Sequence, residues 1–182
     1  ETLRNADERP AITYLSVDAE PITVTRAEFM RAITGYGAAL RSMGIAPRDL
    51  VIIAHTQDLE SVFAFWGAML IGAIPSMFPT LTEKLDPDIY MANMAELVRL
   101  SAVKAILTTD AFAPTLAAQV ECPVYGSGAL LASVNDAAVF TPYAPQADEI
   151  AFLQHSSGTT GLQKGVALAH RAVLNQLASY SD

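Results

Sequence analysis

Short apolar runs alternate with helix-period segments along most of this chain, and this alternation limits the possible folds more than any other feature. Leu50–Ala54 is continuously apolar, as expected for a strand that is covered on both faces. A helical segment over 59–71 follows it, and another apolar run over 73–78 comes next. Strands and helices that alternate at this spacing predict βαβ units. We therefore expect an α/β fold in three layers, with a mostly parallel sheet flanked by helices.

Local signals predict the remaining elements. Residues 11–17 and 21–24 are expected to form a strand pair, and Thr25 with Glu28 forms a capping box before a helix that Gly44 ends. One face of that helix is apolar: Phe29, Ile33, Tyr36, Leu40 and Met43. Three more strands are expected, over 103–107, 124–125 and 149–154. Three more helices are expected, one starting at Asp86-Pro87 with Tyr90, Met94, Leu97 and Val98 buried, one capped by Asp110 and ending at Gln119, and one over 170–180.

Charge and cysteine content exclude several classes of protein. The net charge is −8, and no basic stripe is present, so we expect no nucleic-acid partner. Cys122 is the single cysteine, which rules out a disulfide within the chain and suits a cytoplasmic location. We expect this thiol, next to Pro123, to be inert packing. Residues 1–7 lack the apolar core of a secretory signal.

One uncharged segment, Ser61–Thr82, is long enough to raise the question of a membrane span. However, Pro75 and Pro79 interrupt it, and the flanking residues Glu60 and Glu83 are acidic rather than basic. We therefore expect a buried helix that leads directly into a buried strand, and no membrane span.

The segment 155–165 has a composition that packing does not require. It reads His-Ser-Ser-Gly-Thr-Thr-Gly-Leu-Gln-Lys-Gly and follows an apolar strand. Glycines allow backbone N–H groups to approach an anion closely, and hydroxyl groups add donors for phosphate oxygens. Lys164 adds a mobile positive charge of the kind that binds phosphate. The alternative is a simple flexible connection, but the ordered mixture favours a polyphosphate-binding loop.

Other phosphate or nucleophile motifs do not fit. The Walker pattern requires Gly-Lys-Ser/Thr, whereas residues 163–165 read Gln-Lys-Gly. Gly35 and Gly37 begin a dinucleotide-like pattern, but Leu40 occupies the third glycine position and the segment is expected to be helical. Gly126–Gly128 lacks the spacing of a hydrolase nucleophile elbow.

The loop resembles the phosphate-binding signature of the adenylate-forming (AMP-binding) superfamily, which includes acyl-CoA synthetases, fatty-acyl-AMP ligases, luciferases and peptide-synthetase adenylation domains. Its usual form is Thr/Ser-Ser-Gly-Ser/Thr-Thr-Gly-x-Pro-Lys-Gly, so this chain departs at Gln163, where proline is expected. Segments 166–174, 22–29, 48–51 and 67–75 are also similar to the family, so the likeness covers nearly the whole chain. Segment 79–87 is closer to acyl-acid ligases than to amino-acid activators.

The resemblance implies ATP-dependent activation of a carboxylic acid, fatty or aryl, as acyl-adenylate with release of pyrophosphate. A thiol of CoA or of a phosphopantetheinyl carrier protein would then accept the acyl group, with ATP bound as its magnesium complex. The nucleotide-binding residues implied are Ser156, Ser157, Gly158, Thr159, Thr160, Gly161, Lys164 and Gly165.

The resemblance also implies that residues 1–182 are the N-terminal part of an adenylation domain, without its C-terminal parts. No complete catalytic set is expected here, and we expect the chain alone to be inactive. The alternative is a non-catalytic module of the same fold that binds a nucleotide or a partner.

Other candidate residues have less specific signals. His155 is expected either to touch the nucleotide or acyl group or to be structural, whereas His55 and His170 are expected to be structural. No two histidines have metal-ligand spacing, so no metal site is expected. A core aromatic group is expected: Phe63, Phe65 and Trp66. Helix caps and solvated turns are expected at four acidic residues: Asp86, Asp88, Asp148 and Glu149.

Overall fold

The computed structural model describes residues 7–16, 19–56, 58–81, 85–133, 141–155 and 165–180. Its main sheet has six strands in the order β6-β5-β3-β4-β7-β8. Every neighbouring pair is parallel except the antiparallel pair β7–β8. The strands are β3 (Leu50–Ala54), β4 (Ile74–Met77), β5 (Ala105–Thr108), β6 (Val124–Gly126), β7 (Ile150–His155) and β8 (Gly165–Ala169). The predicted α/β class with a mostly parallel sheet is confirmed.

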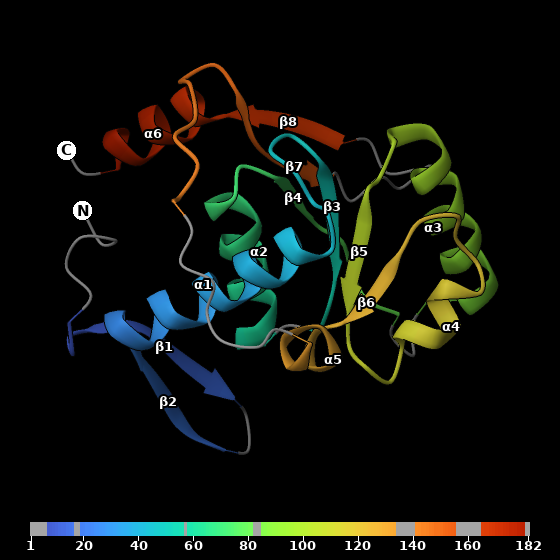
Figure 1. Cartoon of the computed structure of the whole chain (residues 1–182), viewed down its shortest axis with the longest axis horizontal. Helices are drawn as coiled ribbons and strands as arrows, with labels where there is room; N and C mark the ends of the chain where they lie inside the picture. Colours follow the sequence, from blue (N-terminus) through green and yellow to red (C-terminus); the bar gives the residue numbers. More distant parts are fainter. Residues whose placement is uncertain are drawn as a thin grey trace.

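Helices cover both faces of this sheet (Figure 1). The helices are α1 (Arg26–Ser42), α2 (Leu59–Leu70), α3 (Pro87–Ser101), α4 (Ala113–Ala117), α5 (Ser127–Ala132) and α6 (His170–Ser179). Alternate residues of β3 face opposite layers: Val51 and Ile53 pack with α1 and α2, while Ile52 and Ala54 pack with α3 and α4. The three-layer arrangement therefore follows from strands that are apolar on both faces.

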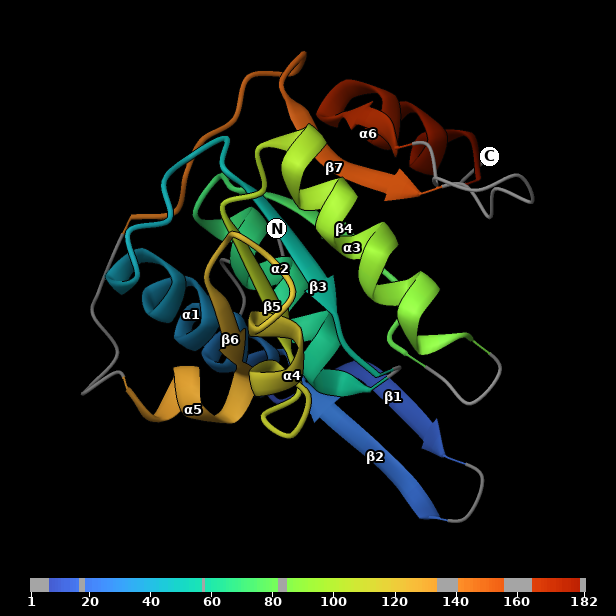
Figure 2. The same ribbon diagram turned by 90° about the vertical axis from the view of Figure 1, so that its right-hand side faces the viewer.

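A separate antiparallel hairpin precedes the sheet. It consists of β1 (Pro10–Ser16) and β2 (Ala19–Thr25), and Figure 2 shows it projecting from one end of the molecule. Val24 anchors it in the core beside α1. The capping box is present, because the Glu28 N–H donates to Thr25 Oγ1 at 3.2 Å and the Thr25 N–H donates to Glu28 Oε2 at 2.8 Å. The predicted strand pair and the start of α1 are confirmed.

Helices α1 and α2 approach each other closely where Gly67 faces Tyr36. A Cβ atom on Gly67 would lie 2.5 Å from the Tyr36 Cβ atom, so only glycine allows this packing. The Tyr36 hydroxyl donates to Glu60 Oε2 at 2.5 Å, which ties the middle of α1 to the first turn of α2. Burial, followed by this hydrogen bond, raises the pKa of Tyr36. Ile33, Tyr36 and Leu40 are buried, as the periodicity of the helix predicts.

The predicted cap at Asp110 is wrong. Helix α4 begins after Phe112 and has no side-chain cap, because Asp110 points instead towards the start of α5. Its Oδ1 atom accepts a hydrogen bond from the Ala129 N–H at 3.1 Å. A Cβ atom on Gly126 or Gly128 would collide with this carboxylate, which explains why glycine occupies both positions. The sequence analysis had assigned no function to this segment.

The predicted aromatic core is correct only in part. Phe63 is buried, but Trp66 is 46% exposed and packs edge-on against Phe29 and Phe65 at the surface of α2. Helix α2 leads into β4 as expected for the uncharged segment. Within the described ranges, no helix is long and apolar enough to cross a membrane.

Candidate nucleotide-binding site

The glycine- and hydroxyl-rich segment lies between the last two strands. β7 ends at His155 and β8 begins at Gly165, and these two residues are register partners in the antiparallel pair. Seven predicted site residues lie outside the described residues: Ser156, Ser157, Gly158, Thr159, Thr160, Gly161 and Lys164. Their roles in binding therefore stay predictions. Gly165 is among the described residues, and its backbone lies beside that of His155 in the antiparallel pair.

β7 ends, and β8 begins, at the edge of the sheet where ligands of α/β proteins bind. We call the edge formed by the carboxyl ends of β3, β4, β5, β6 and β7 the carboxyl edge, and the opposite one the amino edge. The connection after β3 runs through α2 on one face, whereas the connection after β4 runs through α3 on the other face. Adjacent strands whose connections diverge in this way leave a crevice outside their carboxyl ends. β7 lies directly beside β4.

His155 is held firmly at this edge. Its Nε2 atom lies 2.8 Å from the Ser76 hydroxyl of β4, and its ring packs edge-on against Phe78 with 5.3 Å between ring centroids. Burial lowers the pKa of His155. Its Nδ1 atom is buried and has no hydrogen-bond partner among the described residues. The structure thus brings His155 together with Ser76, a contact that the sequence analysis did not predict. The sequence feature that could have indicated it is a polar serine within a buried strand.

Three more buried polar atoms at the carboxyl edge lack partners in the described part of the chain: His55 Nε2, Tyr90 Oη and Ser127 Oγ, the last directly after β6. His55 follows β3, is buried as predicted, and places Nδ1 3.0 Å from Asp58 Oδ2. Asp58 caps α2 by accepting from the Ser61 N–H at 2.9 Å. Tyr90 lies in the first turn of α3 against Phe78, and burial raises its pKa to about 12.

Unpartnered buried polar atoms are rare in folded proteins, and each needs an explanation such as a ligand or a bound water. His55, Tyr90, Ser127 and His155 come from four different parts of the chain and lie at the same edge. This concentration is what a polar binding crevice outside the strand ends would produce.

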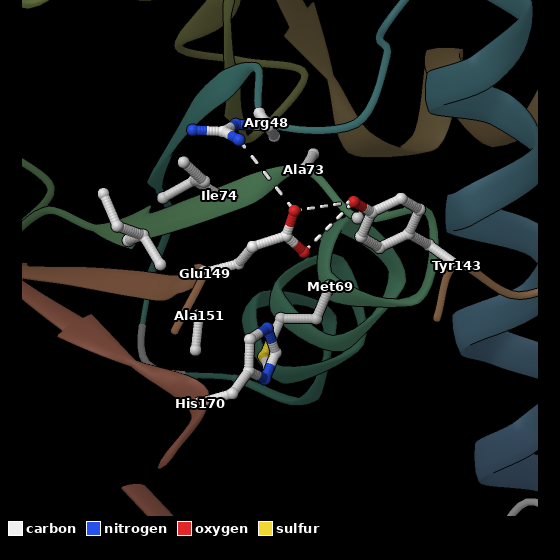
Figure 3. A pocket seen from close by; sticks show the side chains of 10 residues that line it. Arg48, Met69, Ala73, Ile74, Tyr143, Glu149, Ala151 and His170 are labelled. Carbon is white, nitrogen blue, oxygen red and sulfur yellow. Dashed lines mark hydrogen bonds and ion pairs between the residues drawn. The ribbon is translucent and has the colours of Figure 1, made fainter. Parts of the chain in front are cut away.

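The amino edge holds a different cluster, shown in Figure 3. The Tyr143 hydroxyl donates to both carboxylate oxygens of Glu149, at 3.0 and 3.1 Å, and the Gln146 N–H donates to Oε2 at 2.9 Å. Arg48 lies 3.9 Å from Oε1. These bonds, led by that from Gln146, lower the pKa of Glu149. Glu149 lies in the predicted turn, with its N–H donating to the Gln146 carbonyl oxygen, but its side chain is hydrogen-bonded and only 19% exposed rather than solvated.

The cavity beside this cluster measures about 20 Å³. A cavity of that size holds roughly one water molecule and no nucleotide. His170 lines it at the start of α6, consistent with the structural role predicted for this residue. A larger hollow of about 410 Å³ lies between α3 and α4, with Met91 and Gln119 in its wall.

The remaining candidates are structural. Asp86 caps α3 through the Asp88 and Ile89 N–H groups, as predicted, whereas Asp148 pairs with Arg171 at the surface. Cys122 is half-buried, and burial raises the pKa of its thiol, so its nucleophilic form is disfavoured. Among the described residues, no group of three or more His, Cys, Asp and Glu side chains could hold a metal ion.

The sequence profile of the AMP-binding enzyme family matches residues 1–182. This chain belongs to the AMP-binding enzyme family. The match spans the whole α/β unit, including the segment between β7 and β8.

Three curated proteins have related sequences. The chain is 24% identical over 163 residues to atromentin synthetase invA2 of Paxillus involutus, covering 90% of this chain and 17% of that protein. It is 28% identical over 156 residues to 4-chlorobenzoate–CoA ligase of Arthrobacter sp, covering 82% and 28%. It is 29% identical over 159 residues to 4-coumarate–CoA ligase 2 of Nicotiana tabacum, covering 80% and 28%. The chain thus spans less than a third of the length of these relatives.

Solved structures share the fold. The McyG A-PCP structure complexed with phenylalanyl-adenylate matches with a TM-score of 0.84 at 20% identity, covering 98% of this chain and 29% of that one. O-succinylbenzoate coenzyme A synthetase (MenE) from Bacillus subtilis, in complex with AMP, matches with a TM-score of 0.79 at 23% identity, covering 99% and 44%.

Proposed function

We propose that the full-length polypeptide containing this chain activates a carboxylic acid with ATP. A carboxylate oxygen attacks the α-phosphorus, the bond between that phosphorus and the bridging oxygen to the β-phosphate breaks, and pyrophosphate leaves with the electron pair. The thiol of CoA or of a phosphopantetheinyl carrier protein then attacks the acyl carbon and releases AMP. Family membership supports this reaction. The observation that carries it is that β7 ends at His155 and β8 begins at Gly165 at the carboxyl edge of the sheet.

In this proposal the segment binds the β- and γ-phosphates as they become the leaving group. Phosphoryl transfer depends mainly on positioning and on neutralising charge, and a donor-rich loop provides both. Gly158 and Gly161 allow close approach of the backbone. Four hydroxyl groups donate to phosphate oxygens: Ser156, Ser157, Thr159 and Thr160. Lys164 offsets negative charge, Gly165 anchors the return into β8, and magnesium enters as MgATP.

We propose an aryl or fatty acid as substrate, and the names of two relatives favour the aryl class. Those relatives are ligases for 4-chlorobenzoate and 4-coumarate, and both names specify CoA as the acceptor. CoA is therefore the first acceptor to test, with a carrier protein second. The reducing environment suggested by the single cysteine favours a cytoplasmic location.

The 182-residue chain by itself is expected to be inactive. It covers less than a third of the compared relatives, so most residues of a complete active site would come from the remaining sequence. Acid-dependent exchange by the isolated chain would contradict this expectation.

The test is acid-dependent ATP–pyrophosphate exchange by the full-length polypeptide, with benzoates, cinnamates and fatty acids of increasing length. Lys164→Ala should lower exchange at least about ten-fold, since a hydrogen bond between charged groups contributes about 1.5–3 kcal/mol. Lys104→Ala is the matched control, because Lys104 is exposed at the amino edge. A folded protein that binds ATP but shows no exchange with any acid would favour the non-catalytic alternative.

A further inference from the structure

The hydrogen bonds around His155 favour one protonation pattern of its ring. Ser76 Oγ lies 3.3 Å from the Leu153 carbonyl oxygen and 2.8 Å from His155 Nε2. A hydroxyl has one proton to donate, and a carbonyl oxygen can only accept. With a separate proton for each contact, Ser76 donates to Leu153 and His155 Nε2–H donates to Ser76. The neutral ring then has no proton on Nδ1.

The Nδ1 atom is therefore an acceptor. It is buried, and no donor among the described residues reaches it. Burial lowers the pKa of this histidine, which keeps the ring neutral at pH 7. Gly165 faces the same side of the ring, since a Cβ atom there would lie 3.8 Å from Cε1 and 4.0 Å from Nδ1. The ring thus borders both the point where the chain leaves β7 and the point where it enters β8.

We propose that His155 is a positioning residue of the nucleotide site, with Nε2–H held by Ser76 and Nδ1 accepting a hydrogen bond from an N–H or O–H donor of that site. Phosphate and carboxylate oxygens cannot donate, so His155 does not bind these groups directly. Its effect on ATP passes through the donor that it orients. This inference rests on the proposed function, because it requires that the carboxyl edge binds a nucleotide.

The protonation pattern is tested first, by ¹⁵N NMR of the imidazole nitrogens in the 182-residue chain at pH 7.5. We expect a protonated Nε2 and an unprotonated Nδ1 for His155, and a mixture of tautomers in Ser76→Ala. A ring protonated at Nδ1 in the wild-type chain would overturn the inference. This measurement requires no catalytic activity, so it is separate from the test of the proposed function.

Two substitutions then separate the ring nitrogens in the full-length polypeptide. The amide of His155→Asn occupies the position of Nδ1, whereas that of His155→Gln occupies the position of Nε2 and keeps a partner for Ser76. We expect the dissociation constant for ATP to rise about ten-fold in His155→Gln, which corresponds to the loss of one net hydrogen bond. In His155→Asn it should rise less than about three-fold. The KM for the acid should change little.

His170→Gln is the matched control, since His170 lies at the amino edge and should not affect ATP binding. Equal ATP affinity in all variants, or a larger loss in His155→Asn than in His155→Gln, would assign His155 a structural role and overturn the inference. A wild-type polypeptide that binds ATP but shows no exchange would defeat only the proposed reaction. A wild-type polypeptide that binds no ATP would contradict both the proposed reaction and the inference about His155.

Discussion

The two edges of the parallel sheet differ in how their polar groups are satisfied. At the amino edge, Glu149 accepts hydrogen bonds from the Tyr143 hydroxyl and the Gln146 N–H, and approaches Arg48. At the carboxyl edge, four buried polar atoms have no partner within the described residues, one each in His55, Tyr90, Ser127 and His155.

This difference separates stability from binding. A polar group that is fully hydrogen-bonded within the protein fixes the structure around it, whereas an unpartnered buried group destabilises the free protein. The amino edge therefore maintains the fold. The carboxyl edge keeps hydrogen-bonding capacity for whatever enters the crevice, and the phosphate-binding segment is proposed to act there.

The largest effect should come from a substitution at the amino edge, Gly72→Ala. Gly72 has a φ of 82°, and a Cβ atom there would lie 2.4 Å from Tyr143 Cγ. Left-handed strain and overpacking together should lower the free energy of unfolding by about 2–5 kcal/mol. Gly44→Ala is the matched control, because Gly44 has a φ of 83° with nothing within 4 Å, and should lose only about 1–2 kcal/mol from strain. Equal losses in urea denaturation would show that Tyr143 does not pack tightly on Gly72.

A pair of tyrosine substitutions compares a partnered hydroxyl with an unpartnered one. Tyr36→Phe should cost about 1–2 kcal/mol, because it removes the bond to Glu60 while the exposed Glu60 carboxylate regains water. Tyr90→Phe should give between no change and a gain of about 1 kcal/mol, because it removes a buried hydroxyl that has no described partner. A clear loss in Tyr90→Phe, measured by the same denaturation, would mean that the hydroxyl has a partner such as a bound water.

A smaller and pH-dependent effect is expected for Glu149→Gln. The pKa of Glu149 is lower in the folded chain than its ordinary value of 4.5, so the unfolded chain binds more protons at acidic pH. Its contribution to stability is therefore complete above about pH 4.5 and is lost as the pH falls through the lowered pKa. The variant should melt below the wild type at pH 7, and the two melting temperatures should converge in acid. Asp148→Asn, which changes a 79% exposed side chain, should shift neither temperature appreciably. A difference that persists unchanged at pH 3 would contradict this assignment.

Local patterns predicted most of the elements. The capping box at Thr25, the left-handed Gly44 and the Asp86-Pro87 helix start are signals within a few residues, and each is present in the structure. The apolar run Leu50–Ala54 correctly predicted a strand buried on both faces.

Contacts between distant residues could not be predicted in this way. Asp110 bonds across 19 positions to α5 rather than capping its own helix, and Ser76 meets His155 across 79 positions. Tyr143 covers Glu149 from a segment without regular structure, and Trp66 lies on an outer helix surface that periodicity alone did not separate from the core.

The sequence alone determined the α/β class, the boundaries of most elements and the segment proposed to bind phosphate, because hydrophobic period, caps and motifs are short-range properties. The tertiary structure alone decided which polar groups became partners. It placed Ser76 beside His155 and left Nδ1 without a described donor, because strand order and register bring together residues that no local pattern connects.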